Sequence, residues 1–217
     1  MAIVLGRRIR RAPSTSARWS RRARARVASL ILAALATAPA AGSAYAAEIA
    51  GISFAEQLRV GPEGANLLTL RGLGLLRFRV VLRGYVAALY LPPRVPIESV
   101  LREVPRRLEI QYFWGIGAAG FAKATNEGIQ KNVSPERWRS LQPHVEQFND
   151  LYLDVEPGDR YALTYLPGRG TELALNGKSL GSVESPEFGA ALFAIWLGED
   201  PFDASLKEQL LRGLDSD

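Results

Sequence analysis

The side chains with the clearest chemical potential in this sequence are arginines on a β-like run from Leu67 to Pro92. Alternate residues of a strand point to opposite faces, so the spacing places apolar residues on one face and cationic residues on the other. The apolar set is Phe78, Val80 and Leu82, and the cationic set is Arg77, Arg79 and Arg83. A guanidinium that faces an apolar interior needs an anion, to which it gives a bidentate, charge-assisted pair. Arg77 is therefore a candidate anion-binding residue.

The residues after Arg83 determine what else can share a site with Arg77. The segment 85–91 is apolar on both faces, which is typical of a central strand with something packed on each side. Pro92 and Pro93 end the run, because proline cannot donate to a ladder. Gly84 can host either a bulge or the turn of a hairpin. Its conformation decides whether Arg77 and Tyr85 reach the same cavity, and the sequence leaves this point open.

Other site chemistries find little support. The chain has no cysteine and one histidine, His144. Zinc, haem and iron–sulfur sites need more such ligands, and a Ser-His-Asp or Cys-His arrangement cannot be built with confidence. We expect no metal and no cofactor.

The first 46 residues predict a secretory signal peptide. They combine a long basic segment, an apolar core at 27–36 and a small-x-small cleavage site at 44–46. We expect cleavage after Ala46, a periplasmic location and no stable membrane span afterwards. An uncleaved anchor is the alternative, but the apolar run is shorter than the roughly 20 residues that cross a bilayer. Arg21-Arg22 is only a weak signal for twin-arginine export.

Removing this leader reverses the charge balance. Nine of the 27 basic residues lie in 1–46, which holds no acidic residue, so the remaining 18 oppose 22 acidic ones and leave a net charge of −4. A basic balance would indicate nucleic-acid binding, and the region after the leader lacks one. Residues 47–217 suffice for one packed domain, which in an oxidising compartment must be stable without disulfides.

The elements that must position these side chains follow in order. We expect a strand over 49–60 with Ile52 and Phe54 buried and Leu58 as a further candidate, then the run at 67–91, and a short helix at 96–101. Residues 107–114 predict a strand with one apolar face. That face consists of Leu108, Ile110, Tyr112 and Trp114.

Helices and a β-meander make up the rest. A helix over 118–131 places Phe121 and Thr125 on one face, and Ser134 caps a second helix that begins at Pro135. Three short strands follow between 161 and 183, linked by turns at 167–170 and Asn176-Gly177. Two further helices are expected at 188–197 and 204–212, the first capped by Ser185 and the second by Asp203. These elements predict one α+β domain, an antiparallel sheet with helices on one face.

Several segments resemble the bacterial, exported branch of the chalcone isomerase-like family. The resemblance rests on 70–91, 107–128, the meander with Tyr165-Leu166-Pro167-Gly168-Arg169-Gly170, and 191–201 followed by Leu206-Lys207. It implies an open-faced β-sandwich, a large antiparallel sheet backed by helices, with a ligand cleft between the two layers.

The resemblance also allows the chemistry to be compared position by position. Arg77 resembles the arginine that anchors substrate in the plant enzymes, and Tyr85 stands where they carry a threonine. Phe121 and Gly128 stand where they carry a tyrosine and an asparagine, and Ala194-Ile195 lacks their last hydroxyl. A site with so few donors is poorly equipped for the cyclisation.

These departures resemble the fatty-acid-binding members of the family, in which an arginine and a tyrosine hold a carboxylate. We therefore expect a non-catalytic binding protein for a fatty acid or similar amphipathic carboxylate. The predicted ligand-binding residues are Arg77, Tyr85, Phe121, Thr125 and Ile195. Each buried methylene would add about 0.8 kcal/mol to binding.

Three alternatives stay open. In an isomerase or intramolecular lyase, Arg77 would stabilise an oxyanion and Tyr85 would be the acid. In a structural envelope protein, the pocket would be a relic. In the third, Arg77 pairs with Glu109 or Glu127 and no ligand is involved. Arg79 and Arg83 are expected at the surface or the rim, and the oligomeric state is left open.

Overall fold

The computed structural model describes residues 46–78 and 82–212 of the 217-residue chain. The predicted signal peptide lies outside the described residues except for Ala46, which begins the first strand, and so do the predicted orientations of Arg79 and Val80. The strands are β1 Ala46–Ile49, β2 Ile52–Ala55, β3 Gln57–Val60, β4 Asn66–Phe78, β5 Leu82–Leu91, β6 Arg106–Tyr112, β7 Arg160–Leu166, β8 Gly170–Leu175 and β9 Lys178–Val183. The helices are α1 Ala118–Asn132, α2 Pro135–Asn149, α3 Pro186–Leu197 and α4 Ala204–Leu211, with short 3-10 turns η1 Pro62–Gly64 and η2 Ile97–Ser99.

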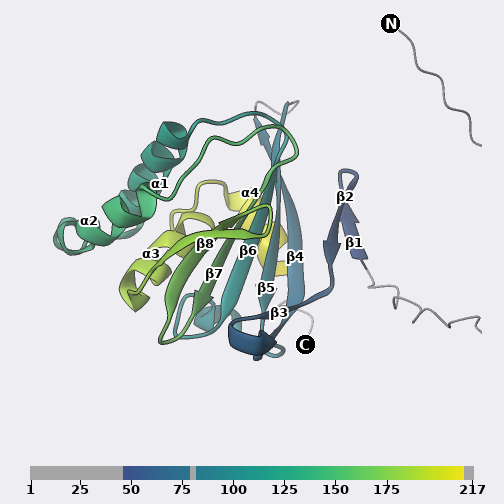
Figure 1. The fold of residues 1–217 in the computed structure, drawn as a ribbon, viewed down its shortest axis with the longest axis horizontal. Coiled ribbons are helices and arrows are strands. Elements are labelled where there is room, and N and C mark those ends of the chain that lie inside the picture. The colour runs from purple at the N-terminus through teal and green to yellow at the C-terminus, as the bar shows by residue number, and fades with distance from the viewer. Residues whose placement is uncertain (1–45, 79–81, 213–217) are drawn as a thin grey trace, which may run out of the picture. The chain divides into compact units, whose positions relative to one another are not determined.

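Seven strands form one antiparallel sheet in the order β3-β4-β5-β6-β7-β8-β9, so each strand pairs with its neighbours in sequence. Strands β1 and β2 form a separate hairpin. In Figure 1, α1, α2 and α3 lie to the left of the sheet and the β1–β2 hairpin lies to its right. The predicted α+β architecture, an open-faced sandwich with helices backing a large antiparallel sheet, is confirmed.

The central strand β5 contributes to a core on each side of the sheet. Tyr85, Ala87, Leu89 and Leu91 belong to the core shared with the helices. The alternate residues 86, 88 and 90 belong to a second core that also contains Phe54 of the hairpin. The prediction that 85–91 is packed on both faces is therefore correct, and two-sided burial explains its continuous apolar character.

The expected strand over 77–83 is wrong, because the chain reverses between Phe78 and Leu82, which pair across β4 and β5. Gly84 forms the bulge that the sequence allowed. Tyr85 pairs with Leu76 and Arg83 pairs with Arg77, so Gly84 is an extra residue in β5. One extra residue reverses the facing of everything beyond it.

The N-terminal strand expected over 49–60 is also divided. The chain turns back between Ile49 and Ile52, with positive φ at Ala50 (54°) and Gly51 (84°), and a separate strand β3 begins at Gln57. Positive φ at both central residues is the geometry of a tight hairpin. The helix expected at 96–101 is only the single turn η2.

The helix starts agree with their predicted caps. Side chains of Ser134, Ser185 and Asp203 each accept a hydrogen bond from the backbone N–H three residues on. Helix α4 packs on β4 where Gly72 lacks a side chain, since a Cβ there would lie 2.2 Å from the Leu210 carbonyl oxygen. This close approach explains a glycine inside a strand.

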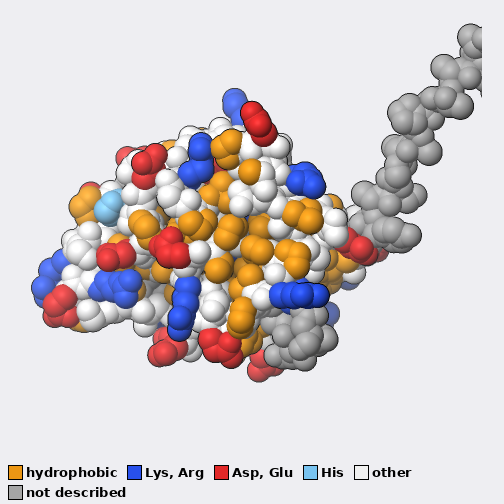
Figure 2. All heavy atoms as spheres, turned by 90° about the horizontal axis from the view of Figure 1, so that it is seen from below, with side chains coloured by type: hydrophobic (Ala, Val, Ile, Leu, Met, Phe, Trp, Pro, Cys, Tyr) orange, Lys and Arg blue, Asp and Glu red, His pale blue; other side chains and the backbone are white. Residues whose placement is uncertain are grey.

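On the surface seen from below in Figure 2, apolar side chains gather in the middle and acidic and basic side chains are interspersed around them. No single-sign charged face of the kind that attracts nucleic acid is visible there. None of the helices in the described residues combines the length and apolar character needed to span a membrane.

Candidate functional site

A cavity of about 530 Å³ lies between the helix-facing side of the sheet and the helices. Its wall is formed by Leu76, Leu82, Gly84, Tyr85, Tyr112, Trp114, Ile116, Gly120, Phe121, Ala124, Trp196 and Phe202. The volume is within the roughly 300–1,000 Å³ typical of small-molecule sites. Its place between the two layers agrees with the cleft that the family resemblance implies.

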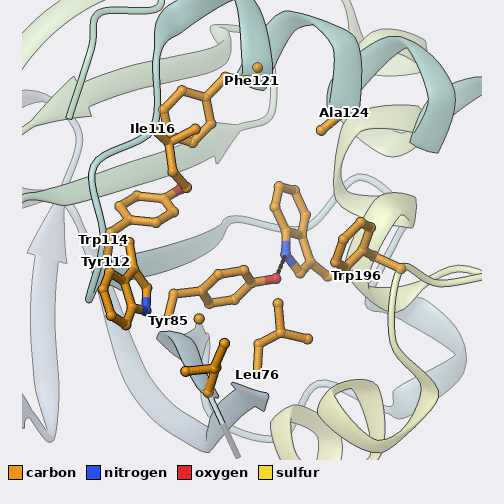
Figure 3. A pocket seen from close by; sticks show the side chains of 12 residues that line it. Leu76, Tyr85, Tyr112, Trp114, Ile116, Phe121, Ala124 and Trp196 are labelled. Atoms are coloured by element: carbon orange, nitrogen blue, oxygen red, sulfur yellow. Dashed lines mark hydrogen bonds between the residues drawn. The ribbon is translucent and has the colours of Figure 1, made fainter. Parts of the chain in front are cut away.

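The sheet supplies one side of the cavity through neighbouring strands. Leu76, Tyr85 and Tyr112 are paired across β4, β5 and β6, so their side chains form one row. Helix α1 faces this row with Phe121 and Ala124, and Figure 3 shows these side chains arranged around a common space. The row is therefore fixed by strand register and the opposite wall by helix packing.

The open end is marked by large apolar residues that both line the cavity and reach solvent. Leu82 is 52% exposed, Trp114 is 56% exposed and Phe202 is 49% exposed. The Trp114 indole N–H donates to the Arg83 carbonyl oxygen at 2.6 Å, which holds its ring beside β5. Exposed apolar residues gathered in this way are typical of an interaction site.

Polar atoms are few in this wall, and none of its lining side chains within the described residues is charged. The Trp196 indole N–H, from α3, donates to the Tyr85 hydroxyl oxygen at 3.0 Å (Figure 3). Burial raises the pKa of Tyr85 well above the usual range of a tyrosine, against the smaller lowering by this hydrogen bond. Burial also raises the pKa of Tyr112. Both phenols are therefore neutral at ordinary pH and act as hydrogen-bonding groups, not as anions.

A smaller cavity of about 50 Å³ adjoins the first one and shares Tyr112, Phe121 and Trp196 with it. Its wall includes Thr125 and Tyr152, whose hydroxyl oxygens lie 2.8 Å apart. The rings of Phe121 and Tyr152 stack with centroids 5.3 Å apart. The inner end of the site is thus aromatic with one internally bonded hydroxyl pair.

The structure brings together three of the five residues predicted to bind ligand. Tyr85 and Phe121 line the larger cavity, and Thr125 lines the smaller one. Ile195 lies in neither wall, because it packs against α1 at Gly128, where a Cβ would lie 2.9 Å from its Cγ1. The binding roles themselves stay predictions.

Arg77 requires a correction. Its side chain is exposed and does not line the cavity, so the expectation of an arginine waiting in an apolar pocket is wrong. Leu76 and Leu82 both face the cavity, and the pleat turns the residues that follow them, Arg77 and Arg83, to the other face. The bulge at Gly84 makes this arrangement possible. Arg77 has not paired with either proposed acid: Glu109 binds Arg107 and Arg160, and Glu127 lies 3.9 Å from Lys123.

Sequence reasoning missed Trp196 and Leu76. Trp196 lies in an α3 sequence that is apolar on all sides, so periodicity did not single it out. Its indole N–H was the available signal, because a buried tryptophan usually needs an acceptor. Leu76 has no polar group, so its residue type alone gave no sign of a place in the site.

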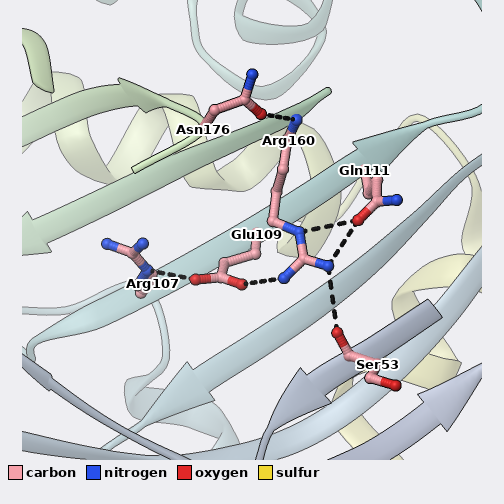
Figure 4. A network of polar contacts seen from close by, with 6 residues as sticks. All are labelled: Ser53, Arg107, Glu109, Gln111, Arg160 and Asn176. Carbon is pink, nitrogen blue, oxygen red and sulfur yellow. Dashed lines mark hydrogen bonds and ion pairs between the residues drawn. The ribbon is translucent and has the colours of Figure 1, made fainter. Parts of the chain in front are cut away.

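A second polar cluster lies on the opposite face of the sheet, under the β1–β2 hairpin (Figure 4). Glu109 accepts from Arg107 at 3.0 Å and from Arg160 at 3.2 Å. Arg160 also donates to the Ser53 carbonyl oxygen and lies over the Phe54 ring at 4.3 Å. These contacts attach the hairpin to the sheet, which makes the cluster structural. Within 46–78 and 82–212, no three His, Cys, Asp or Glu side chains are grouped so that they could hold a metal.

Comparisons with known proteins agree with this geometry. A family model described as chalcone isomerase-like matches residues 46–212. A search of curated proteins finds no match. Among solved structures, the chain is similar to an Arabidopsis thaliana fatty-acid binding protein, with a TM-score of 0.63 and 17% identity over 79% of this chain and 98% of that one. At this identity the likeness concerns the fold.

Proposed function

Because this chain belongs to the chalcone isomerase-like family, whose fold encloses a cleft between sheet and helices, we propose that it is a non-catalytic binding protein for a lipid with an acyl chain, such as a fatty acid. The observation that carries the proposal is the cavity itself: about 530 Å³ of space walled by aliphatic and aromatic side chains. The name of its structural neighbour as a fatty-acid binding protein supports the same class of ligand.

The energetics favour a chain-like apolar ligand. Each methylene transferred from water into such a wall contributes about 0.8 kcal/mol, or roughly a fourfold gain in affinity. The exposed Leu82, Trp114 and Phe202 offer an apolar opening through which a chain can enter. The hydrocarbon then lies along the row of Leu76, Tyr85 and Tyr112.

The same wall gives little support to the isomerase alternative. Arg77, the cation proposed to stabilise an oxyanion, lies outside the cavity. Tyr85, the proposed acid, has a raised pKa, and efficient general acids have pKa values near the working pH. The site can therefore hold and orient a ligand better than it can move a proton.

The place of action we propose is the periplasm, reached through a signal peptide removed after Ala46. The support is the basic segment, apolar core and small-residue cleavage pattern of 1–46. Expression of the full chain in a Gram-negative host, followed by intact-mass measurement of the periplasmic fraction, should give the 47–217 product. A full-length chain that stays with the membranes would contradict this part of the proposal.

The binding proposal is tested with delipidated protein and saturated fatty acids and their methyl esters of 8 to 16 carbons. Displacement of a fluorescent apolar probe measures each affinity. We expect affinity to rise about fourfold per methylene and then level off when the cavity is full. Failure of every acid and every ester to displace the probe would overturn the proposed function.

A further inference from the structure

The Tyr85 hydroxyl accepts a hydrogen bond within the protein but donates none to a described residue. It accepts from the Trp196 indole N–H at 3.0 Å (Figure 3). An indole nitrogen is a donor only, so the phenolic proton cannot point back at it. No acceptor for that proton occurs among the described residues, and the side chain faces the cavity. The proton is thus available to a ligand.

The donation from Trp196 also improves Tyr85 as a donor. In a chain of hydrogen bonds, a hydroxyl that accepts one bond is polarised and gives a stronger one to the next acceptor. The low-dielectric surroundings of an apolar wall strengthen that bond further. Trp196 therefore holds the Tyr85 hydroxyl in place as a hydrogen-bond donor within an otherwise apolar cavity.

Among the described residues, no charged side chain lines the wall beside this donor. The pleat of β4 places Arg77, which follows Leu76, on the far face of the sheet, and the Gly84 bulge places Arg83 on the same face as its partner Arg77. An ionised carboxylate taken into such a wall loses its hydration without gaining a counter-charge, which is strongly unfavourable. A carbonyl oxygen needs only one donor to be satisfied.

We propose that the cavity recognises a neutral carbonyl acceptor, such as that of an acyl ester, through the Tyr85 hydroxyl, and discriminates against an ionised carboxylate. This inference rests on the proposed function, since it names the head group of the same acyl ligand. Tyr85 determines the ligand's register: the carbonyl lies at the Tyr85–Trp196 pair, and the apolar remainder occupies the rest of the wall.

The test compares dodecanoic acid with methyl dodecanoate at pH 8, where the acid is ionised, in the probe-displacement assay. The ester should bind at least tenfold more tightly than the ionised acid. Tyr85→Phe, which keeps the ring and removes the proton, should weaken ester binding about two- to tenfold, as expected for one neutral hydrogen bond.

Tyr90→Phe is the matched control. Tyr90 is on the same strand and is also buried, but its side chain belongs to the core on the other face of the sheet. This variant should bind the ester as the parent does, and dodecane should bind parent and Tyr85→Phe alike.

The failures are distinguishable. If neither the acid nor the ester binds, the proposed lipid-binding function itself is refuted. If the ionised acid binds as tightly as the ester or more so, lipid binding stands and the neutral-carbonyl inference is overturned; this comparison needs no variant. If the ester is preferred but Tyr85→Phe leaves its affinity unchanged, the assignment to Tyr85 is overturned.

Discussion

Filling the cavity from α1 should weaken lipid binding strongly without unfolding the protein, and Ala124→Trp is the substitution that does so most directly. Ala124 lines both the larger cavity and the smaller one beside it. It is nevertheless an exposed residue of the helix, so no close-packed neighbour has to move. The new indole therefore grows into the space that the acyl chain would occupy.

The expected loss follows from the area that the indole takes away from the ligand. A tryptophan side chain covers at least about 150 Å² of apolar surface. At about 25 cal/mol per Å², excluding the ligand from that area removes roughly 3–4 kcal/mol of binding, or several hundredfold in affinity. Part of the chain can shift toward the mouth and keep some contacts, so we expect a loss of about 100-fold.

The assay is displacement of the apolar probe by methyl dodecanoate, with thermal unfolding measured in parallel. Ala119→Trp is the matched control, because Ala119 is an exposed alanine of the same helix that does not line the cavity. It should bind like the parent. Equal affinities of the two variants, with both folded, would refute the placement of the ligand in this cavity.

Three other substitutions test the fold and the electrostatics. Gly128→Ala gains about 1 kcal/mol of helix propensity but forces a Cβ to 2.9 Å from Ile195 Cγ1, so we expect a net loss of about 1–2 kcal/mol in urea unfolding. The loss should disappear when Gly128→Ala is introduced into an Ile195→Ala background, which lacks the crowded Cγ atoms. Stabilisation by Gly128→Ala alone would show that α1 and α3 are less tightly packed. Glu109→Gln removes the negative charge that Arg107 and Arg160 share. The free energy of unfolding should fall by about 2 kcal/mol, which corresponds to a fall of roughly 4–8 °C in Tm. Ester affinity should be unchanged, because this network lies on the opposite face of the sheet from the cavity. Altered ligand binding in this variant would contradict that separation. Leu82→Arg places a cation at the mouth of the cavity and should raise the affinity for ionised dodecanoic acid at least tenfold at pH 8. The affinity for methyl dodecanoate should stay within twofold of that of the parent. An unchanged affinity for the acid would show that head groups do not reach position 82.

Much of the fold was accessible from sequence because its signals are local. The caps at Ser134, Ser185 and Asp203 need only one side chain and a nearby backbone N–H, and the alternation along β6 reflects the apolar core that packs on its helix-facing side. The two failures of strand prediction are turns with weak sequence signals. The Ile49–Ile52 turn combines Gly51 with an alanine, Ala50, at positive φ, and the reversal between Phe78 and Leu82 has no glycine or proline in the sequence between them.

The site was harder to predict because orientation in a strand depends on counting residues. The sequence allowed a bulge at Gly84 but could not distinguish it from a turn, and that single residue decides which face Arg83 presents relative to Tyr85. Tyr85 and Phe121 were found through the family resemblance, which places them where the plant enzymes carry site residues. The Tyr85–Trp196 contact joins residues 111 positions apart, which no local pattern reveals.

Binding of the acyl chain in the cavity can be tested directly by anomalous diffraction from crystals grown with an acyl ester that carries bromine at the end of its chain. We expect a bromine peak inside the cavity walled by Leu76, Phe121 and Trp196, with the ester carbonyl at the Tyr85 hydroxyl. A bromine peak on the outer face of the sheet, or an empty cavity in crystals of protein shown to bind the ester in solution, would contradict it.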